Sequence, residues 1–233
     1  PEGDLPRDAI FTPDGSRILI ANRNSGNVLV YDAATRAVVA DIAVGGQPVN
    51  LTLSPNGQYA LTANTASNTI SIIDLSTLTL AHEVPVSGSW PYRVKVTPDG
   101  QHAIVASSDR FSVVSMTSFQ ESSSFASPDL GMVSFSVTSS RALPISVGYA
   151  DFAITPNSQT LVVPDAGFSA SELKLRLYDL ASGSDTAALQ LPGRGTAVTV
   201  TADGSSAYVA TTPRISVGID SITKVDLNLG TIT

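Results

Sequence analysis

The chain of 233 residues contains no cysteine and only two histidines, His82 and His102. The lack of cysteine excludes disulfides, thiolate metal sites and cysteine nucleophiles. Two scattered histidines cannot form a transition-metal site of three nitrogen or sulfur ligands, and they disfavour a Ser-His-Asp triad, although a mixed carboxylate site stays open. The sequence also lacks a Gly-x-Ser-x-Gly elbow, a Walker sequence and a Cys-x-x-Cys-His haem attachment. We therefore expect no catalytic residues, no metal and no cofactor.

Charge is scarce as well. Charged residues make up 14% of the chain and the net charge is -7, so there is no basic stripe for nucleic acid or anionic lipid. No apolar run approaches the ~18 residues of a membrane span. The first residues do not read as a signal segment, and the start at Pro1 rather than Met suggests that a leader or an upstream region has been removed.

One phrase recurs five times along the sequence. It is clearest at Thr12-Pro13-Asp14-Gly15 and Ser54-Pro55-Asn56-Gly57, returns at Thr97 and Thr155, and is degraded at Thr201. Successive copies are 42, 43, 58 and 46 residues apart, which is the period of a four-stranded propeller blade. The sequence therefore predicts an all-β fold, one β-propeller domain over residues 1–233, with blades at about 6–47, 48–90, 91–148, 149–194 and 195–233.

Each copy divides into four short segments with strand patterning, which in the first copy are 6–12, 17–22, 27–32 and 37–44. Asp-Gly and Asn-Gly predict tight hairpins between first and second strands, and no segment has the pattern of a sizeable helix. The positions two and four residues before each repeated Pro or Ala are all apolar, including Ala9 and Phe11, so we expect them in the core. The recurring Asp32, Asp74, Asp179 and Asp226 are expected to accept hydrogen bonds from turns.

The segments Gly57-Gln58-Tyr59-Ala60-Leu61-Thr62-Ala63-Asn64, Asn68-Thr69-Ile70-Ser71-Ile72-Ile73-Asp74 and Val86-Ser87-Gly88-Ser89-Trp90-Pro91 together resemble the YVTN repeat family of β-propellers. The resemblance implies a protein that is secreted, periplasmic or on the surface of a prokaryotic cell, and a scaffold without a shared catalytic set. Such propellers commonly have seven blades, whereas five are counted here.

The phase of the repeats bears on whether the blades form a closed ring. The chain begins with a first strand and ends early in a fourth strand, and the spacing wrapped around the ends is 44 residues. An open sheet edge exposes unpaired backbone groups, so we expect a closed five-bladed ring with Thr231–Thr233 beside the first blade. The alternative is an excerpt of a larger propeller.

Loops on one face, the top, are candidates for a binding site, because insertions on one face of a repeat array often mark it. Blades four and five carry longer loops at 166–171 and 212–218. In blade three, either 132–137 is the third strand and 108–131 is a long excursion, or 111–116 is the third strand and 122–127 is a plain connection.

A second candidate is a polar row at the mouth of the central channel. Asp8, Asn50, Arg93 and Asp151 stand five residues before successive repeat anchors, amid apolar neighbours, and Trp90 lies on the adjoining top loop. These five residues are the predicted ligand-binding set. The alternative is that Arg93 pairs with Asp8 or Asp151 and the row is structural.

These observations favour a non-enzymatic scaffold in the extracellular space, on the cell surface or in the periplasm, binding a protein or a glycan through its top face. A propeller hydrolase or lactonase is the alternative from the enzyme class. A structural surface-layer or stalk module is the third interpretation.

Overall fold

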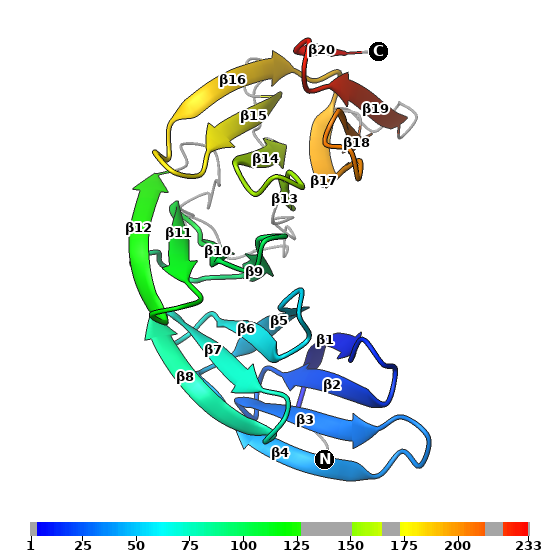
Figure 1. Cartoon of the computed structure of the whole chain (residues 1–233), viewed down its shortest axis with the longest axis vertical. Helices are drawn as coiled ribbons and strands as arrows, with labels where there is room; N and C mark the ends of the chain where they lie inside the picture. Colours follow the sequence, from blue (N-terminus) through cyan, green and yellow to red (C-terminus); the bar gives the residue numbers. More distant parts are fainter. Residues whose placement is uncertain (1–3, 127–150, 165–172, 213–220, 233) are drawn as a thin grey trace, which may run out of the picture. The chain divides into compact units, whose positions relative to one another are not determined.

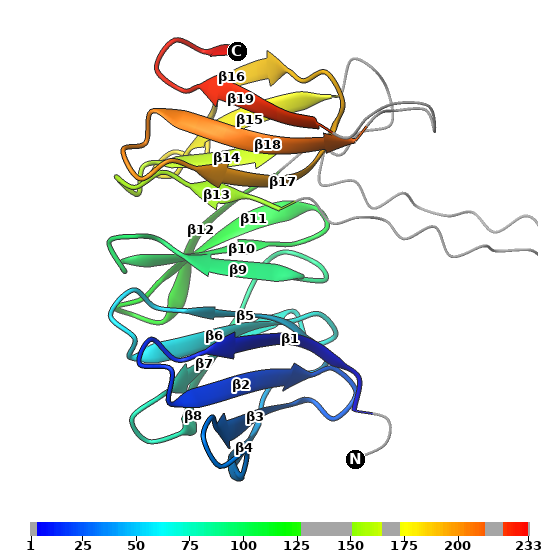
Figure 2. The same cartoon turned by 90° about the vertical axis from the view of Figure 1, so that its right-hand side faces the viewer.

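The computed structural model describes residues 4–126, 151–164, 173–212 and 221–232. The chain divides into two compact units, Pro1–Ala126 and Ser127–Thr233. Each unit is built from four-stranded antiparallel sheets in which consecutive strands are neighbours (Figures 1 and 2).

The first unit contains three sheets, which correspond to blades one to three. Their strands are β1 (Pro6–Phe11), β2 (Arg17–Asn22), β3 (Asn27–Asp32), β4 (Val38–Ala43), β5 (Pro48–Leu53), β6 (Tyr59–Asn64), β7 (Thr69–Asp74), β8 (Thr79–Pro85), β9 (Arg93–Val96), β10 (His102–Ala106), β11 (Arg110–Ser115) and β12 (Gln120–Ala126). The four strands expected in the first copy are thus confirmed to within a residue at each end.

The second unit contains the two sheets of blades four and five. Their strands are β13 (Ala153–Ile154), β14 (Thr160–Pro164), β15 (Lys174–Asp179), β16 (Asp185–Gln190), β17 (Arg194–Val200), β18 (Ser206–Thr212), β19 (Ser221–Asp226) and β20 (Thr231–Ile232). The fold class is confirmed: five four-stranded antiparallel blades of a β-propeller, with no helix among the described residues. Ring closure stays a prediction.

The sequence motif that recurs five times forms the hairpin between the first and second strands of each blade. In the first copy, the Thr12 hydroxyl donates to Asp14 Oδ1 at 2.6 Å, and the Ser16 amide donates to the same oxygen at 3.0 Å. Gly15 follows with φ +69, a left-handed conformation in which glycine has no Cβ to clash. The same hydroxyl-to-Asx bond closes the other four hairpins, at Ser54–Asn56, Thr97–Asp99, Thr155–Asn157 and Thr201–Asp203.

Apolar clusters fill the space between neighbouring blades. Leu19 and Val30 of blade one pack with Leu51 and Ile73 of blade two. Equivalent clusters join blades two and three, and blades four and five. Full burial of one such side chain stabilises the fold by about 1.5–3 kcal/mol. The core therefore lies between the faces of the blades.

The expected burial of the first strand is wrong for blade one. Leu51, Val94, Phe152 and Val198 are buried as predicted, whereas Ala9 is exposed and Phe11 is 60% exposed. Within the first unit, the sheet of blade one packs on the sheet of blade two, and Ala9 and Phe11 belong to neither of the buried clusters there. An apolar residue of a strand is therefore buried only where a neighbouring sheet packs against the side of the strand that carries it.

Blade three resolves the two interpretations of its middle. β11 at Arg110–Ser115 is the third strand, so the version with 111–116 in that place is confirmed and the long excursion over 108–131 is wrong. Ser122–Ala126 belongs to the fourth strand, β12, rather than to a connection. The alternative third strand at 132–137 and the loops at 166–171 and 213–218 lie outside the described residues. Consequently, the loop between the second and third strands of blade three is not lengthened.

No helix in the described ranges is long and apolar enough to cross a membrane.

Candidate functional site

Each blade has two ends that differ in construction. The turn end carries the hairpins between first and second and between third and fourth strands. The top end carries the loop between second and third strands and the segment that leads into the first strand. The residues predicted to bind a ligand all lie at or near top ends.

At the turn ends, aspartates hold the backbone. Asp32 Oδ1 accepts from the Thr35 amide at 2.7 Å, and Asp74 Oδ1 accepts from the Ser76 amide at 2.7 Å. Asp179 and Asp226 accept from turn amides in the same way. The structural role expected for these four residues is confirmed. Such bonds favour the charged carboxylate, so the bonds from Thr35 lower the pKa of Asp32 and those from Ser76 lower that of Asp74.

The strongest effects of this kind lie in the repeated hairpin. The bond from the Thr12 hydroxyl, followed by those from Ser16, lowers the pKa of Asp14 from 3.8 to about 2. Thr201 and Ser205 lower the pKa of Asp203 to about 2 in the same manner. These shifts mark turn structure, because the same geometry is formed by Asn56 and Asn157, which cannot ionise.

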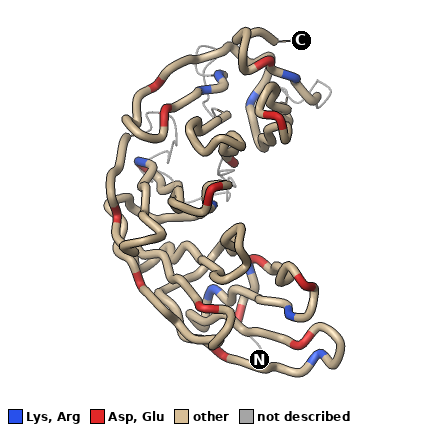
Figure 3. The backbone as a smooth tube through the Cα atoms, in the orientation of Figure 1, with Lys and Arg blue, Asp and Glu red and all other residues tan. Residues whose placement is uncertain are grey.

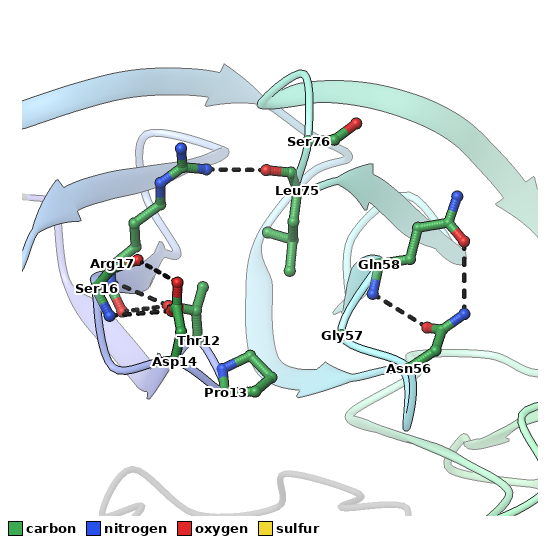
Figure 4. Close-up of a pocket in the computed structure, with 10 residues that line it drawn as sticks. All are labelled: Thr12, Pro13, Asp14, Ser16, Arg17, Asn56, Gly57, Gln58, Leu75 and Ser76. Atoms are coloured by element: carbon green, nitrogen blue, oxygen red, sulfur yellow. Dashed lines mark hydrogen bonds between the residues drawn. The ribbon is translucent and has the colours of Figure 1, made fainter.

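Hollows between blades at the turn ends repeat with the fold. One of about 410 Å³ lies between blades one and two, where Arg17 Nη1 donates to the Leu75 carbonyl at 2.9 Å (Figure 4). Others of about 400 and 700 Å³ lie between blades two and three and between blades four and five. Because each is lined by the repeated hairpins, we interpret them as a product of blade packing.

In the polar row, the side chains of Asp8 and Asn50 form hydrogen bonds from one first strand to the next, an arrangement that we call the relay. Asp8 Oδ2 accepts from Asn50 Nδ2 at 3.0 Å and from the Leu51 amide at 2.8 Å. Asn50 Oδ1 accepts in turn from the Val94 amide at 2.8 Å. The first strand is the edge of its sheet, so these side chains satisfy backbone amides that the sheet leaves unpaired. Asp8 and Asn50, both half-buried, thus lie together, and both hold the first strands in register.

Arg93 changes the chemistry of this row in blade three. It occupies the place of Asp8 and Asn50 and is half-buried, but a guanidinium offers no acceptor, so the relay cannot continue through it. Asp151 lies in the second unit, where its Oδ1 accepts from the Phe152 amide at 2.8 Å. The equivalent bond in blade one runs from the Ala9 amide to Asp8 Oδ1 at 2.9 Å.

Trp90 occupies an unusual backbone position. Leu5, Gln47 and Trp90 each precede a proline at the same place in blades one, two and three, and their φ angles are +51, +59 and +55. A left-handed conformation is unfavourable for a bulky side chain. Trp90 is nonetheless 50% exposed, so the burial of its indole does not account for its presence. Because Leu5 and Gln47 share the conformation, the turn does not require a tryptophan either.

Hydrogen bonds fix the loop that carries Trp90 from both sides. From blade two, Asn68 Oδ1 accepts from the Trp90 amide at 2.9 Å, and the Thr65 hydroxyl donates to the Pro91 carbonyl at 3.0 Å. From blade three, Asp109 Oδ1 accepts from the Ser89 amide at 2.9 Å. The tryptophan is therefore presented from a braced backbone rather than from a loose loop.

Two further features surround this loop and were not identified from the sequence. A Cβ on Gly88 would lie 2.3 Å from Ser107 Oγ, so only glycine allows the loop to approach Ser107, the residue after β10, this closely. Asp109 and Arg110 form an exposed ion pair at 3.4 Å. The dipeptide Asp109-Arg110 was visible in the sequence, but its place at the top of blade three depended on the choice of the third strand. We call Trp90, Asp109 and Arg110 the Trp90 site.

Neither histidine belongs to this region. His82 lies in β8, the last strand of its sheet, and its ring is stacked on Phe119 at 4.0 Å between centroids. Phe119 also meets the edge of Tyr59 at 5.7 Å. His102 is the first residue of β10, at a turn end. In the described parts of the chain, no three His, Asp or Glu residues are grouped to hold a metal ion.

Comparison with known proteins places the chain among propellers. A family model described as Cytochrome D1 heme domain matches residues 2–141. Among solved structures, Kuenenia stuttgartiensis hydrazine synthase matches with a TM-score of 0.77 and 23% sequence identity. The match covers 100% of this chain and 66% of that one, so the chain spans less than two thirds of its length. No curated protein matches. The expected propeller family is supported at this coarser level, and the matching family is not the YVTN repeat family.

Proposed function

The chain belongs to the cytochrome d1 haem domain family, and from this premise we propose that it acts as a binding scaffold whose recognition site is the Trp90 site, with Arg93 beside it. The observation that carries the proposal is the exposed Trp90, held in a left-handed backbone conformation by hydrogen bonds from two blades. A rigid aromatic anchor loses little conformational freedom on binding, which favours affinity.

Among the residues that the structure describes, the potential iron ligands do not form a site for the haem of its family. Haem iron is held by His, Cys, Met or Tyr side chains. Cysteine is absent from the sequence, His82 is stacked on Phe119 at an outer strand, and His102 lies at a turn end. Met116 packs against the core cluster of blades two and three. His82, His102 and Met116 lie away from the Trp90 site, and Tyr92, two residues after Trp90, is buried. No step of the proposed function therefore passes through a haem.

The distribution of charge supports a partner that is not nucleic acid. In Figure 3, lysine and arginine are interspersed with acidic residues along the described parts of each unit. With a net charge of -7, the protein would repel polyanions. A protein or a glycan is the remaining class of partner. The resemblance to YVTN repeats supports a place outside the cytoplasm, in the periplasm or at the cell surface.

Within this proposal, the members of the polar row have different tasks. Asp8 and Asn50 support the first strands beneath the site, because their oxygens are engaged by backbone amides. Arg93, half-buried at the start of β9, offers guanidinium N–H donors to oxygen atoms of the partner. Asp151 is retained as a candidate contact of the second unit. The hydrolase alternative has no support from the described residues, since neither histidine adjoins this row.

The test uses surfaces coated with envelope proteins or with cell-wall polysaccharide, over which the purified protein is passed. Wild-type protein should be retained on one of them, and Trp90→Ala and Arg93→Glu should each reduce retention about tenfold or more. Gln47→Ala, at the equivalent loop position of blade two, is the matched control and should bind normally. Thermal melts should shift little, because surface changes usually alter stability by within about 0.5 kcal/mol.

Equal retention of all variants, or no retention of the wild type on either surface, would contradict the proposal. So would unfolding by Arg93→Glu. Haemin added to the same protein should give no 1:1 change in the Soret band.

A further inference from the structure

We infer that the Trp90 site takes a neutral saccharide, with one sugar ring stacked on the indole. The inference rests on the proposed function and names its ligand. The first observation is that few large apolar side chains are exposed at the top ends of the first unit. Among the exposed large apolar side chains of that unit, Phe11, Val38, Val39 and Leu80 lie at or next to turn ends, whereas Leu5 and Trp90 lie at top ends.

A single exposed aromatic ring suits a sugar better than a protein. A stable protein interface buries about 800 Å² on each partner and has a cluster of apolar anchors at its centre. Among the described residues at the top end of blades two and three, Trp90 is the one exposed large apolar side chain, and its neighbours are polar. One indole face matches the apolar C–H face of a single pyranose ring in size.

The polar groups around the loop suit hydroxyl groups. Asp109 and Arg110 are 46% and 36% exposed in their side chains, so both keep surface available to a ligand. A carboxylate accepts and a guanidinium donates, which allows the pair to bind adjacent sugar hydroxyls, each of which does both. Ser89 and Asn68 add a further exposed hydroxyl and amide. The paired charges cancel, so a neutral ligand is favoured over a charged one.

The indole is not needed by the fold. Leu5 and Gln47 adopt the same left-handed conformation at the equivalent positions, so the turn forms without an aromatic ring. Gln47 Oε1 accepts from Arg23 Nη2 at 2.9 Å, which gives that residue a structural contact across the top end of blade one. Trp90 places a bulky, half-exposed side chain where a smaller residue would serve the turn.

The experiment exploits the fact that Trp90 is the only tryptophan. Its fluorescence is titrated with neutral di- and tetrasaccharides of glucose, mannose, galactose and N-acetylglucosamine, and with an oligogalacturonate as the charged comparison. At least one neutral saccharide should give a saturable change in emission, and the oligogalacturonate should bind at least several-fold more weakly.

Variants separate stacking from other effects. Calorimetry with the saccharide that binds most tightly should show that Trp90→Ala lowers the affinity about tenfold or more. Trp90→Phe should lower the affinity less, because a smaller ring still stacks on the sugar. Asp109→Asn should lose affinity, whereas Gln47→Ala and Leu5→Ala should match the wild type.

The outcomes distinguish the two proposals. If no neutral saccharide of the panel changes the emission, but retention on envelope protein depends on Trp90, the ligand class is wrong and the binding scaffold stands. If neither measurement depends on Trp90, both are wrong. Binding of saccharide that is unchanged in Trp90→Ala would also overturn the inference.

Discussion

The turn ends and top ends of the blades come from the same repeat but have different degrees of uniformity. All five turn ends share one hairpin, closed by a Ser or Thr hydroxyl bonded to Asp or Asn. The top ends of blades one to three share a backbone conformation before proline and a backbone hydrogen bond to the carbonyl of the preceding residue, but their side chains differ: Leu5, Gln47 and Trp90. Positions that are uniform among the blades are required by the structure of every blade, whereas positions that differ are not constrained in this way and can serve a function in one blade.

The glycines show the same contrast, and their substitution should have the largest effect. At the top end, Gly88→Ala places a Cβ 2.3 Å from the buried Ser107 Oγ and should cost about 1–3 kcal/mol in the free energy of unfolding. Denaturant unfolding measures it. The double variant Gly88→Ala with Ser107→Gly should recover most of the loss, because the clashing side chain is gone.

At the turn end, Gly15→Ala is the comparison. No heavy atom lies within 4 Å of its added Cβ, and the cost arises from φ +69 alone, about 1–2 kcal/mol. If Ser107→Gly fails to rescue Gly88→Ala, the steric explanation for the top end is wrong.

The relay between first strands should have an effect of comparable size. Asn50→Ala leaves the Val94 amide without its acceptor and should destabilise the protein by about 1–3 kcal/mol. Asp8→Ala removes the acceptor for Leu51 and should do the same. Because Asp8 and Asn50 also bond each other, the double variant should lose less than the sum of the two in urea unfolding. Strict additivity would mean that Asp8 and Asn50 are not energetically coupled.

A smaller effect, of opposite sign, is expected at the turn between third and fourth strands. Arg36, Leu78 and Phe119 have φ of +60, +55 and +54, and Gly183 and Gly230 occupy the same position in blades four and five. Arg36 is exposed, so Arg36→Gly should raise stability by up to about 1 kcal/mol by relieving the left-handed strain. Leu78→Gly should lower it, since Leu78 packs against the core. Two changes of the same sign in thermal melts would refute this explanation.

The last and smallest effect concerns pH. Folding lowers the pKa of Asp14 and Asp203 from 3.8 to about 2, so their contribution to stability is present above pH 3.8 and is lost as pH falls toward about 2. Urea midpoints measured between these values should therefore decline. Asp14→Asn with Asp203→Asn should flatten the decline while keeping the turns, as Asn56 does in blade two. An unchanged slope in the double variant would count against it.

Much of the fold could be predicted from the sequence because it depends on local rules. The hairpins follow from Asp-Gly and Asn-Gly, and the strand limits of blade one follow from alternation. The polar row was found by its spacing alone, but its function was not. Whether Asn50 faces a ligand or the Val94 amide depends on a strand from another repeat, 44 residues away along the chain.

The sequence by itself determined the repeat, the strands and the turns, since these depend on residues within a few positions of one another. Only the tertiary structure decided which apolar residues are buried, as Phe11 illustrates, and which of two segments is the third strand of blade three. It also brought Trp90 together with Asn68 and the Asp109–Arg110 pair. These outcomes depend on the packing of one blade against the next, which periodicity along the chain does not encode.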